Sequence, residues 1–231
     1  MNSVRLFTVT LALVSMALAA PADDLRSARD RQDRAALEKA VQEAARAAAK
    51  LPKDAGAQFR LAQAQSYLAE VELELHDKPA AKTAAEDGIK AADRAVDLQP
   101  QVAEHHRILG TLCGQVVPAQ VLLAFRYGHC ARASIDRAIA LDPRSALAYL
   151  SRGVGNYYLP SAFGGGVDLA IRDFRKALEL DPHLADAHLW LGIALRKAHR
   201  NAEARQEIVK SLELNPNRIW AKQQLDKTPA Q

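Results

Sequence analysis

The sequence predicts an all-α protein built as an array of antiparallel helix pairs. A six-residue phrase at 211–216, Ser-Leu-Glu-Leu-Asn-Pro, has upstream counterparts that end at Pro182, Pro143 and Pro100. A unit that recurs along a chain indicates a repeat architecture. The composition agrees, because the chain is rich in Ala and only 5% aromatic, which favours helices over strands.

The overall composition is that of an ordinary folded protein. The chain has 231 residues, of which 49% are hydrophobic and 25% charged, so it is long enough to bury a substantial core in one or two domains. The formal net charge of +4 is spread over both signs, and the sequence has no run or stripe of Lys and Arg. We therefore expect no nucleic-acid partner.

Residues 1–19 have the pattern of a secretory signal peptide. A short start carrying Arg5 precedes an apolar run, and the segment Ala17–Ala19 supplies the small residues that a signal peptidase recognises. We expect cleavage after Ala19, a periplasmic or secreted mature protein, and no stable membrane span once the signal is removed. The alternative is a retained membrane anchor, which the shortness of the apolar run disfavours.

Residues 23–52 predict an N-terminal capping helix. Leu37, Val41 and Ala48 form an apolar stripe at helical spacing, and Pro52 marks the end of the helix. We expect this helix either to cover one end of the array or to be the second half of a degenerate repeat.

Four helix-pair units are predicted next, at 53–100, 101–143, 144–182 and 183–216. A small residue in the first helix of each later unit (Gly110, Gly153, Gly192) lets the two antiparallel helices approach closely. No unit buries its apolar face alone, so we expect neighbouring units to stack on a shared core. Residues 217–231 are predicted to form a C-terminal capping helix and tail, with Ile219, Trp220 and Leu225 covering the last unit.

The pattern Leu191-Gly192…Ala204…Ile208…Pro216 resembles the tetratricopeptide repeat family, and the resemblance extends over about 53–216. It implies a right-handed superhelix of paired helices with a concave groove that binds peptides or other proteins. The first position of the repeat, often Trp or Tyr in the family, departs from that pattern and is occupied by Gln58, His106, Tyr149 and His188.

Cys113 and Cys130 allow two interpretations. In an exported protein the pair favours a disulfide, whereas in a helical core both residues serve as small buried hydrophobes. The sequence leaves both open because it does not supply the Cα separation that a disulfide needs. A zinc site shared with His129 is disfavoured because the spacing fits no compact site.

Two inserts lengthen the middle units. In the insert at 157–166, Pro160 should end a helix and Gly164–Gly166 should reverse the chain, with Phe163 tucked back as an apolar plug. This insert is either a ligand-contacting loop or a wide turn between helices. The insert at 114–129 contains an apolar run over 121–125 that belongs either in the core or in a docking patch.

The sequence contains no constellation that indicates catalysis. It has no phosphate-binding loop, no His-Glu-x-x-His zinc pattern and no Ser on a strand-to-helix elbow. We therefore predict no catalytic residue, metal or cofactor, and the protein is not expected to be an enzyme.

The groove implied by the repeats is the candidate binding site. Projecting the inner face of the first helix of each unit gives Arg60, Gln63, Tyr67, Arg107, Thr111, Leu150, Val154, Tyr157, Trp190, Ile193 and Lys197. Trp and Tyr beside Arg or Lys are typical anchors for a bound peptide. For Tyr157 and Trp190 the alternative role is packing between neighbouring repeats. That role is favoured for Tyr157, and both roles stay open for Trp190.

These observations predict a non-enzymatic scaffold of the bacterial cell envelope that binds a protein or peptide. The alternative is a small-molecule-binding accessory component of a solute transporter. A closed apolar cavity lined by Tyr157, Tyr158 and Phe163 would favour that alternative, and an open groove would favour the scaffold.

Overall fold

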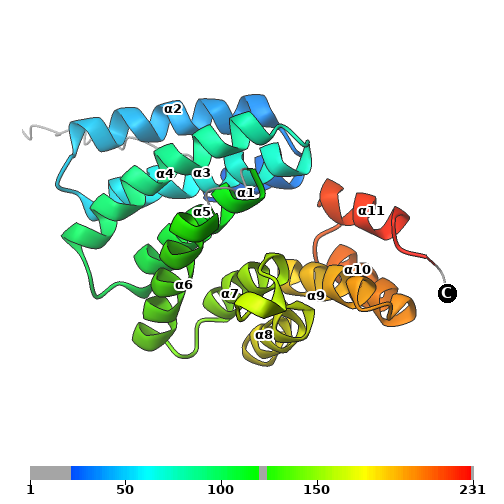
Figure 1. The fold of residues 1–231 in the computed structure, drawn as a ribbon. Coiled ribbons are helices and arrows are strands. Elements are labelled where there is room, and N and C mark those ends of the chain that lie inside the picture. Colours follow the sequence, from blue (N-terminus) through cyan, green and yellow to red (C-terminus); the bar gives the residue numbers. More distant parts are fainter. Residues whose placement is uncertain (1–21, 120–123, 230–231) are drawn as a thin grey trace, which may run out of the picture.

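The computed structural model describes residues 22–119 and 124–229, and over these ranges the regular secondary structure is entirely helical (Figure 1). The predicted all-α class is confirmed. The elements are α1 (Ala22–Asp30), α2 (Arg34–Lys50), α3 (Ala55–Glu74), α4 (Lys78–Leu98), α5 (Ala103–Ala119), α6 (Ala124–Leu141), α7 (Ala146–Tyr158), the short 3₁₀ helix η2 (Ser161–Phe163), α8 (Val167–Leu180), α9 (Ala185–Lys197), α10 (Asn201–Leu214) and α11 (Ile219–Asp226). The predicted signal peptide and the apolar run at 121–123 lie outside the described residues.

Residues 23–52 were expected to form one capping helix, and this was wrong, since the structure divides them into α1 and α2. Gln32 adopts a left-handed backbone conformation (φ 52°), and the side chain of Asp33 accepts a hydrogen bond from the Ala36 backbone N–H, which starts a new helix. The break lets α1 turn away from α2. Arg29 and Asp30, at the end of α1 next to this break, contact residues of the C-terminal half.

Side-chain caps fix the starts of three helices. The side chains of Asp54, Asp77 and Ser145 each accept a hydrogen bond from a backbone N–H three residues later, at the starts of α3, α4 and α7. Pro160 lies just after the end of α7, as predicted from its inability to continue a helix.

The helices of the later pairs are in contact at their glycines. A Cβ atom added at Gly110, Gly153 or Gly192 would lie 2.7, 2.5 and 2.5 Å from the buried side chains of Ile135, Phe174 and Ile208, respectively. The absence of a side chain therefore lets α5–α6, α7–α8 and α9–α10 pack closely around one large apolar residue each.

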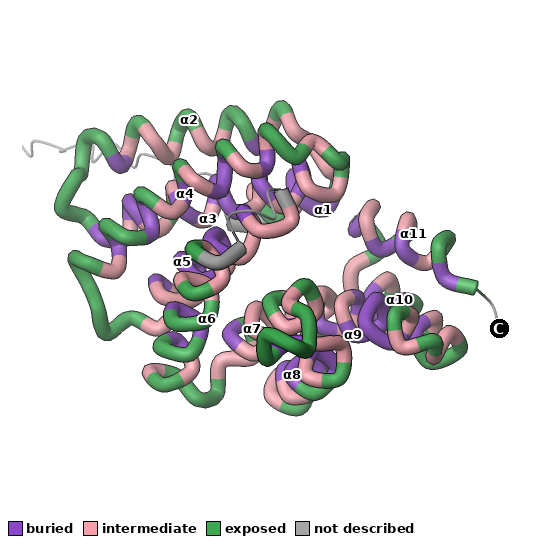
Figure 2. Tube along the Cα trace, in the orientation of Figure 1, coloured by how far each residue is buried: buried purple, intermediate pink, exposed green. Residues whose placement is uncertain are grey.

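The array divides into an N-terminal half, α1–α6, and a C-terminal half, α7–α11. Figure 1 shows α11 turned back across the gap toward α1. Buried residues gather where helices of the same half face one another, and exposed residues cover the outer surfaces (Figure 2). The described part of the chain thus curves until α1 meets α9 and the segment before α11, and a cavity lies between the halves.

Candidate binding cavity

A central cavity of about 1460 Å³, partly open to solvent, lies between the two halves. The first helix of every pair contributes to its wall, together with the end of α1 and the start of α11. Nine of the residues predicted for the groove line this cavity: Gln63, Tyr67, Arg107, Thr111, Leu150, Val154, Tyr157, Trp190 and Ile193. The structure therefore brings predicted groove residues from all four helix pairs together around one cavity.

Arg60 and Lys197 do not line the cavity. Arg60 is exposed near the start of α3. Lys197 is exposed at the end of α9, where its Nζ donates a hydrogen bond to the backbone oxygen of Tyr157 at 3.0 Å and lies 4.2 Å from the Tyr157 ring centroid. On α3 the cavity lining begins at Gln63, so Arg60 lies before it, and on α9 the lining ends at Arg196, so Lys197 lies just beyond it.

Hydroxyl and amide groups line the cavity where α3, α5 and α7 meet. Ser66 donates to Gln115 Oε1 at 3.2 Å, and Gln115 Nε2 donates to the Ser66 backbone oxygen at 3.0 Å. The hydroxyls of Thr111 and Ser151 are 3.0 Å apart. These four residues, the polar floor, offer donors and acceptors to a ligand while linking three helices.

Arg107 is the charged residue beside the polar floor. Its Nε donates to Glu104 Oε2 at 2.7 Å, and its Nη1 lies 3.4 Å from the hydroxyls of Thr111 and Ser151. Burial alone would lower the pKa of Arg107, but the charge and hydrogen bond of Glu104 raise it overall. The guanidinium therefore stays charged and fixed in direction.

Tyr157, Tyr158, Trp190 and Trp220 form an aromatic wall on the other side of the cavity. The Trp190 ring centroid lies 5.7 Å from that of Tyr157, 6.1 Å from Tyr158 and 5.1 Å from Trp220. Trp190 also stacks against Phe174 inside the half, so packing and cavity lining are both roles of this residue. Tyr158 was named only for the alternative apolar cavity, and Trp220 was assigned to the C-terminal cap, so neither was among the predicted groove residues.

The Tyr158 hydroxyl is held in its neutral form. Burial, followed by the neighbouring Tyr157, Glu74 and Glu70, raises the pKa of Tyr158 to about 12. The residue as a whole keeps 46% of its surface exposed. The wall therefore presents an accessible aromatic face with a hydrogen-bond donor at its edge.

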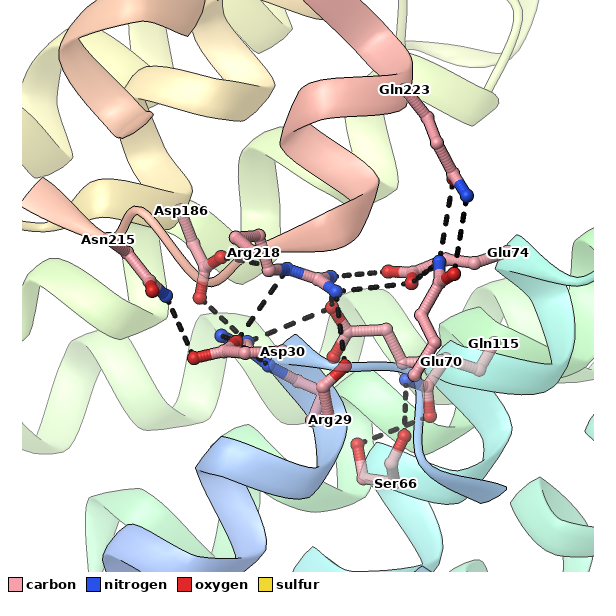
Figure 3. Close-up of polar contacts among 11 residues, drawn as sticks. Arg29, Asp30, Ser66, Glu70, Glu74, Gln115, Asp186, Asn215, Arg218 and Gln223 are labelled. Atoms are coloured by element: carbon pink, nitrogen blue, oxygen red, sulfur yellow. Dashed lines mark hydrogen bonds and ion pairs between the residues drawn. The ribbon is translucent and has the colours of Figure 1, made fainter. Parts of the chain in front are cut away.

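The chain ends meet in a cluster of charged side chains, shown in Figure 3 and here called the ionic seam. It consists of Arg29 and Asp30 from α1, Glu70 and Glu74 from α3, Asp186 from α9, and Asn215 and Arg218 from the segment between α10 and α11. The sequence analysis identified none of these residues.

Arg218 is the centre of the seam, and only 1% of its surface is exposed. Its Nη2 donates to Glu70 Oε1 at 2.7 Å and also to Glu74 Oε1, and its Nη1 donates to Glu74 Oε2 at 3.1 Å. Its Nε makes no hydrogen bond within the described residues and lies 3.8 Å from carboxylate oxygens of Asp30 and Asp186. One cation from the C-terminal half thus lies among carboxylates of both halves.

Arg29 makes the reciprocal contact from the N-terminal half. Its Nη2 donates to Asp30 at 2.6 Å and its Nη1 donates to Asp186 Oδ2 in α9 at 2.7 Å. Asn215 donates to the second oxygen of Asp30 at 2.8 Å. The seam is therefore crossed by directional bonds that originate on both halves.

Burial and charge shift the pKa values in the seam in different directions. Burial, opposed by Arg218 and assisted by Glu70, raises the pKa of Glu74 to about 7. Burial also acts to raise the pKa of Asp186, but Arg29 and Arg218 outweigh it and lower that pKa. Asp186 therefore stays ionised, whereas Glu74 changes charge near neutral pH.

The structure joins Cys113 of α5 to Cys130 of α6 by a disulfide with a Cα–Cα distance of 6.0 Å. Cys113 is fully buried in the apolar cluster formed by α3 to α6, whereas Cys130 is only partly buried beside it, so the structure favours the disulfide interpretation.

Phe163 was expected to tuck back as a plug, and this was wrong. It is 73% exposed, on a turn whose carbonyls at Phe163 and Gly164 accept hydrogen bonds from Arg132. The left-handed backbone of Gly164 (φ 79°) directs the chain back toward α8 and leaves the Phe163 ring outside.

The described residues contain no group of three or more His, Cys, Asp or Glu side chains arranged to hold a metal ion. In the same ranges, every helix falls short of the length and hydropathy that crossing a bilayer requires. The candidate site is a cavity with polar and aromatic lining, and the ion pairs of the seam lie along one side of it.

Sequence comparison gives the family. The profile of the regulator of microtubule dynamics protein 1-3 family matches residues 18–160, which is more than half of the chain. The chain belongs to the regulator of microtubule dynamics protein 1-3 family. A tetratricopeptide repeat profile matches residues 166–225, so the predicted resemblance to tetratricopeptide repeats is confirmed in this member of the family. Such repeats typically serve as non-catalytic scaffolds for protein interactions.

Among curated relatives, regulator of microtubule dynamics protein 3 of Rattus norvegicus is 28% identical over 176 residues. The match covers 69% of this family member and 36% of the rat protein, so this chain aligns with about a third of its relative's length. Among solved structures, the tetratricopeptide repeat protein TTC0263 of Thermus thermophilus aligns over 89% of this chain and 96% of its own, with a TM-score of 0.63 and 19% identity. This last likeness establishes the fold.

Proposed function

We propose that this chain is a non-catalytic scaffold that binds an extended segment of a partner protein in its central cavity. The observation that carries the proposal is the cavity lining, which combines an aromatic wall with a polar floor and draws on the first helix of all four pairs. Aromatic residues provide contact area at small entropic cost, and the floor groups are suited to the N–H and C=O groups of an extended peptide.

Two neighbouring positions of α3 provide a sharp test. A photo-crosslinking amino acid placed at Gln63 faces the cavity, whereas one at Arg60 lies outside it. We expect partner crosslinks from position 63 and few from position 60, with the bound segment identified by mass spectrometry. Equal crosslinking from both positions would contradict the proposal.

The identified segment, made as a peptide, allows a binding measurement. Tyr158→Ala removes part of the aromatic wall and should weaken binding by about fivefold or more, since anchor residues contribute more than about 1 kcal/mol. Tyr149→Ala is the matched control, because Tyr149 of the same helix does not line the cavity. The rat relative is named as a regulator of microtubule dynamics, so purified tubulin is a useful probe in this measurement, and its binding would count against a role in the cell envelope.

The accessory-component alternative finds less support in the cavity. Tyr157 and Tyr158 line it, but Phe163 does not, and charged residues such as Arg107 and Asp186 are part of its wall. This lining differs from the closed apolar chamber expected for a small-molecule carrier, and it suits a peptide with polar and apolar groups.

We also propose that the chain is exported and acts in the bacterial cell envelope. Residues 1–19 support this through their signal-peptide pattern, and a Cys113–Cys130 disulfide suits an oxidising compartment. Fusing residues 1–30 to a reporter enzyme that is active only outside the cytoplasm should give activity, and N-terminal sequencing should find a mature chain that starts at Ala20. A reporter that remains inactive would refute export.

A further inference from the structure

Apolar packing stays within each half of the molecule. Of the four apolar clusters formed by the described residues, two lie in α1–α6 and two in α7–α11. None of these clusters takes side chains from both halves. Each half therefore has its own core, as an independent rigid unit does.

The side-chain hydrogen bonds and ion pairs between the halves lie on two sides of the molecule. One side is where the chain passes from α6 to α7: there Thr111 contacts Ser151, and Arg132 donates to the carbonyls of the turn after α7. The other is the ionic seam, with a neighbouring amide pair between Gln32 and Gln223, where residues more than a hundred positions apart along the chain meet. The cavity lies between these two sides.

Parting the seam exposes charges rather than apolar surface. Buried ions give up hydration when they pair, and they regain it when they separate, so separation is opposed less than the loss of an apolar core. The seam is also imperfectly matched: four carboxylates face two guanidinium groups, and Arg218 Nε has no hydrogen-bond partner in the described chain. A polar interface between two units with separate cores is the kind that permits relative motion.

We propose that the ionic seam is a latch, which parts while the junction of α5 and α6 with α7 acts as a hinge, and that this motion widens the entrance of the central cavity for its ligand. The proposal concerns the motion itself, so it goes beyond the binding function and does not depend on which ligand enters.

The motion is measurable as a distance between the two halves in the full chain. Asp24 of α1 and Lys222 of α11 are exposed on opposite sides of the seam, and the two native cysteines are paired, so Asp24→Cys and Lys222→Cys accept spin labels selectively. In otherwise unchanged protein we expect a distance distribution dominated by one short distance. Adding Arg218→Gln should shift most of the population to longer distances.

A buried ion pair inside one half gives the matched control. Arg152 donates to Asp173 at 2.7 and 3.0 Å within the α7–α8 pair, and the Asp173 side chain is only 3% exposed. Asp173→Asn weakens this pair but should leave the labelled distance unchanged. If Arg218→Gln prevents folding, as judged by circular dichroism, Asn215→Ala removes one seam bond to Asp30 and should give a smaller shift in the same direction.

Two results would overturn the latch. One is an unchanged distance distribution in every folded seam variant, and the other is an equal shift in Asp173→Asn, which would indicate general loosening. Neither result bears on whether a peptide binds, which the crosslinking at Gln63 and Arg60 decides separately.

Discussion

The contacts inside the helix pairs and the contact between the two halves are built from different chemistry. Inside a pair, a glycine faces one large buried side chain, as Gly192 faces Ile208. Between the halves, Arg29 and Arg218 are surrounded by carboxylates and an amide. Both regions are buried, but only the first is apolar.

Apolar packing and ion pairs have different roles in this fold. Apolar packing is non-directional and strong per buried area, so it holds neighbouring helices together wherever their faces are complementary. Ion pairs with fixed geometry specify which ends of the array meet and at what angle, and they contribute little net stability after their desolvation is counted. The array is thus stabilised locally by packing and closed globally by charge.

The largest expected effect comes from removing the central cation of the seam. Arg218→Met leaves Glu70, Glu74 and Asp30 without their shared partner, and breaking a buried pair in this way costs about 3–5 kcal/mol. Urea unfolding at neutral pH measures the change. A loss below about 1 kcal/mol would show that the seam is solvated rather than buried.

The next effect tests the apolar packing of the last pair. Gly192→Leu places a side chain against Ile208 and against the Ala204 backbone oxygen, which would lie 2.8 Å from the new Cβ. Overpacking of this kind costs about 1–3 kcal/mol and should lower the melting temperature. Gly155→Leu is the control on α7, because nothing lies within 4 Å of a Cβ there, and it should be close to neutral.

A third prediction concerns pH. Because the pKa of Glu74 is raised to about 7 in the folded protein, the folded state holds this proton more tightly than the unfolded chain does. The stability contributed by Glu74 is therefore fully present below its ordinary pKa near 4.5, and it is lost as the pH rises toward and through 7.

Glu74→Gln should remove this pH dependence. Between about pH 5 and pH 7 the unaltered protein should lose on the order of 1 kcal/mol more of its unfolding free energy than the variant, since one pKa unit equals about 1.4 kcal/mol. Denaturant unfolding at both pH values gives the difference. Glu213→Gln, at an exposed position, is the control. Identical pH profiles for the unaltered protein and Glu74→Gln would show that the pKa of Glu74 is not raised in the folded protein.

The smallest expected effect comes from an ion pair outside the seam. Lys210 and Glu213 are 2.9 Å apart on the surface of α10, with about half of each side chain exposed. Lys210→Ala should change the unfolding free energy by less than about 0.5 kcal/mol, because water already solvates both charges. A loss as large as that of Arg218→Met would contradict the distinction between seam and surface pairs.

The candidate site was predictable to the extent that it depends on helix periodicity. Gln63, Thr111, Leu150 and Trp190 line the cavity because each lies on the inner face of the first helix of its unit, and these faces point to the same side of the array. Arg60 was misplaced because periodicity gives the face of a helix but not the point along its axis where a cavity ends.

The sequence by itself determined the helix pairs of this protein. The recurring phrases before Pro182 and Pro216, and the glycines at 153 and 192, act over a few turns of helix, where spacing translates directly into contact. These features specify the secondary structure and how each pair packs.

Only the tertiary structure decided that the array closes on itself. Arg29 and Arg218 look like ordinary charged residues of a capping helix and a turn, and nothing local distinguishes them from exposed arginines. Their partners, such as Asp186 for Arg29 and Glu74 for Arg218, lie far away along the chain. The small rotation between successive helix pairs, summed over the whole array, determines whether such ends meet, and that sum is a property of the folded chain.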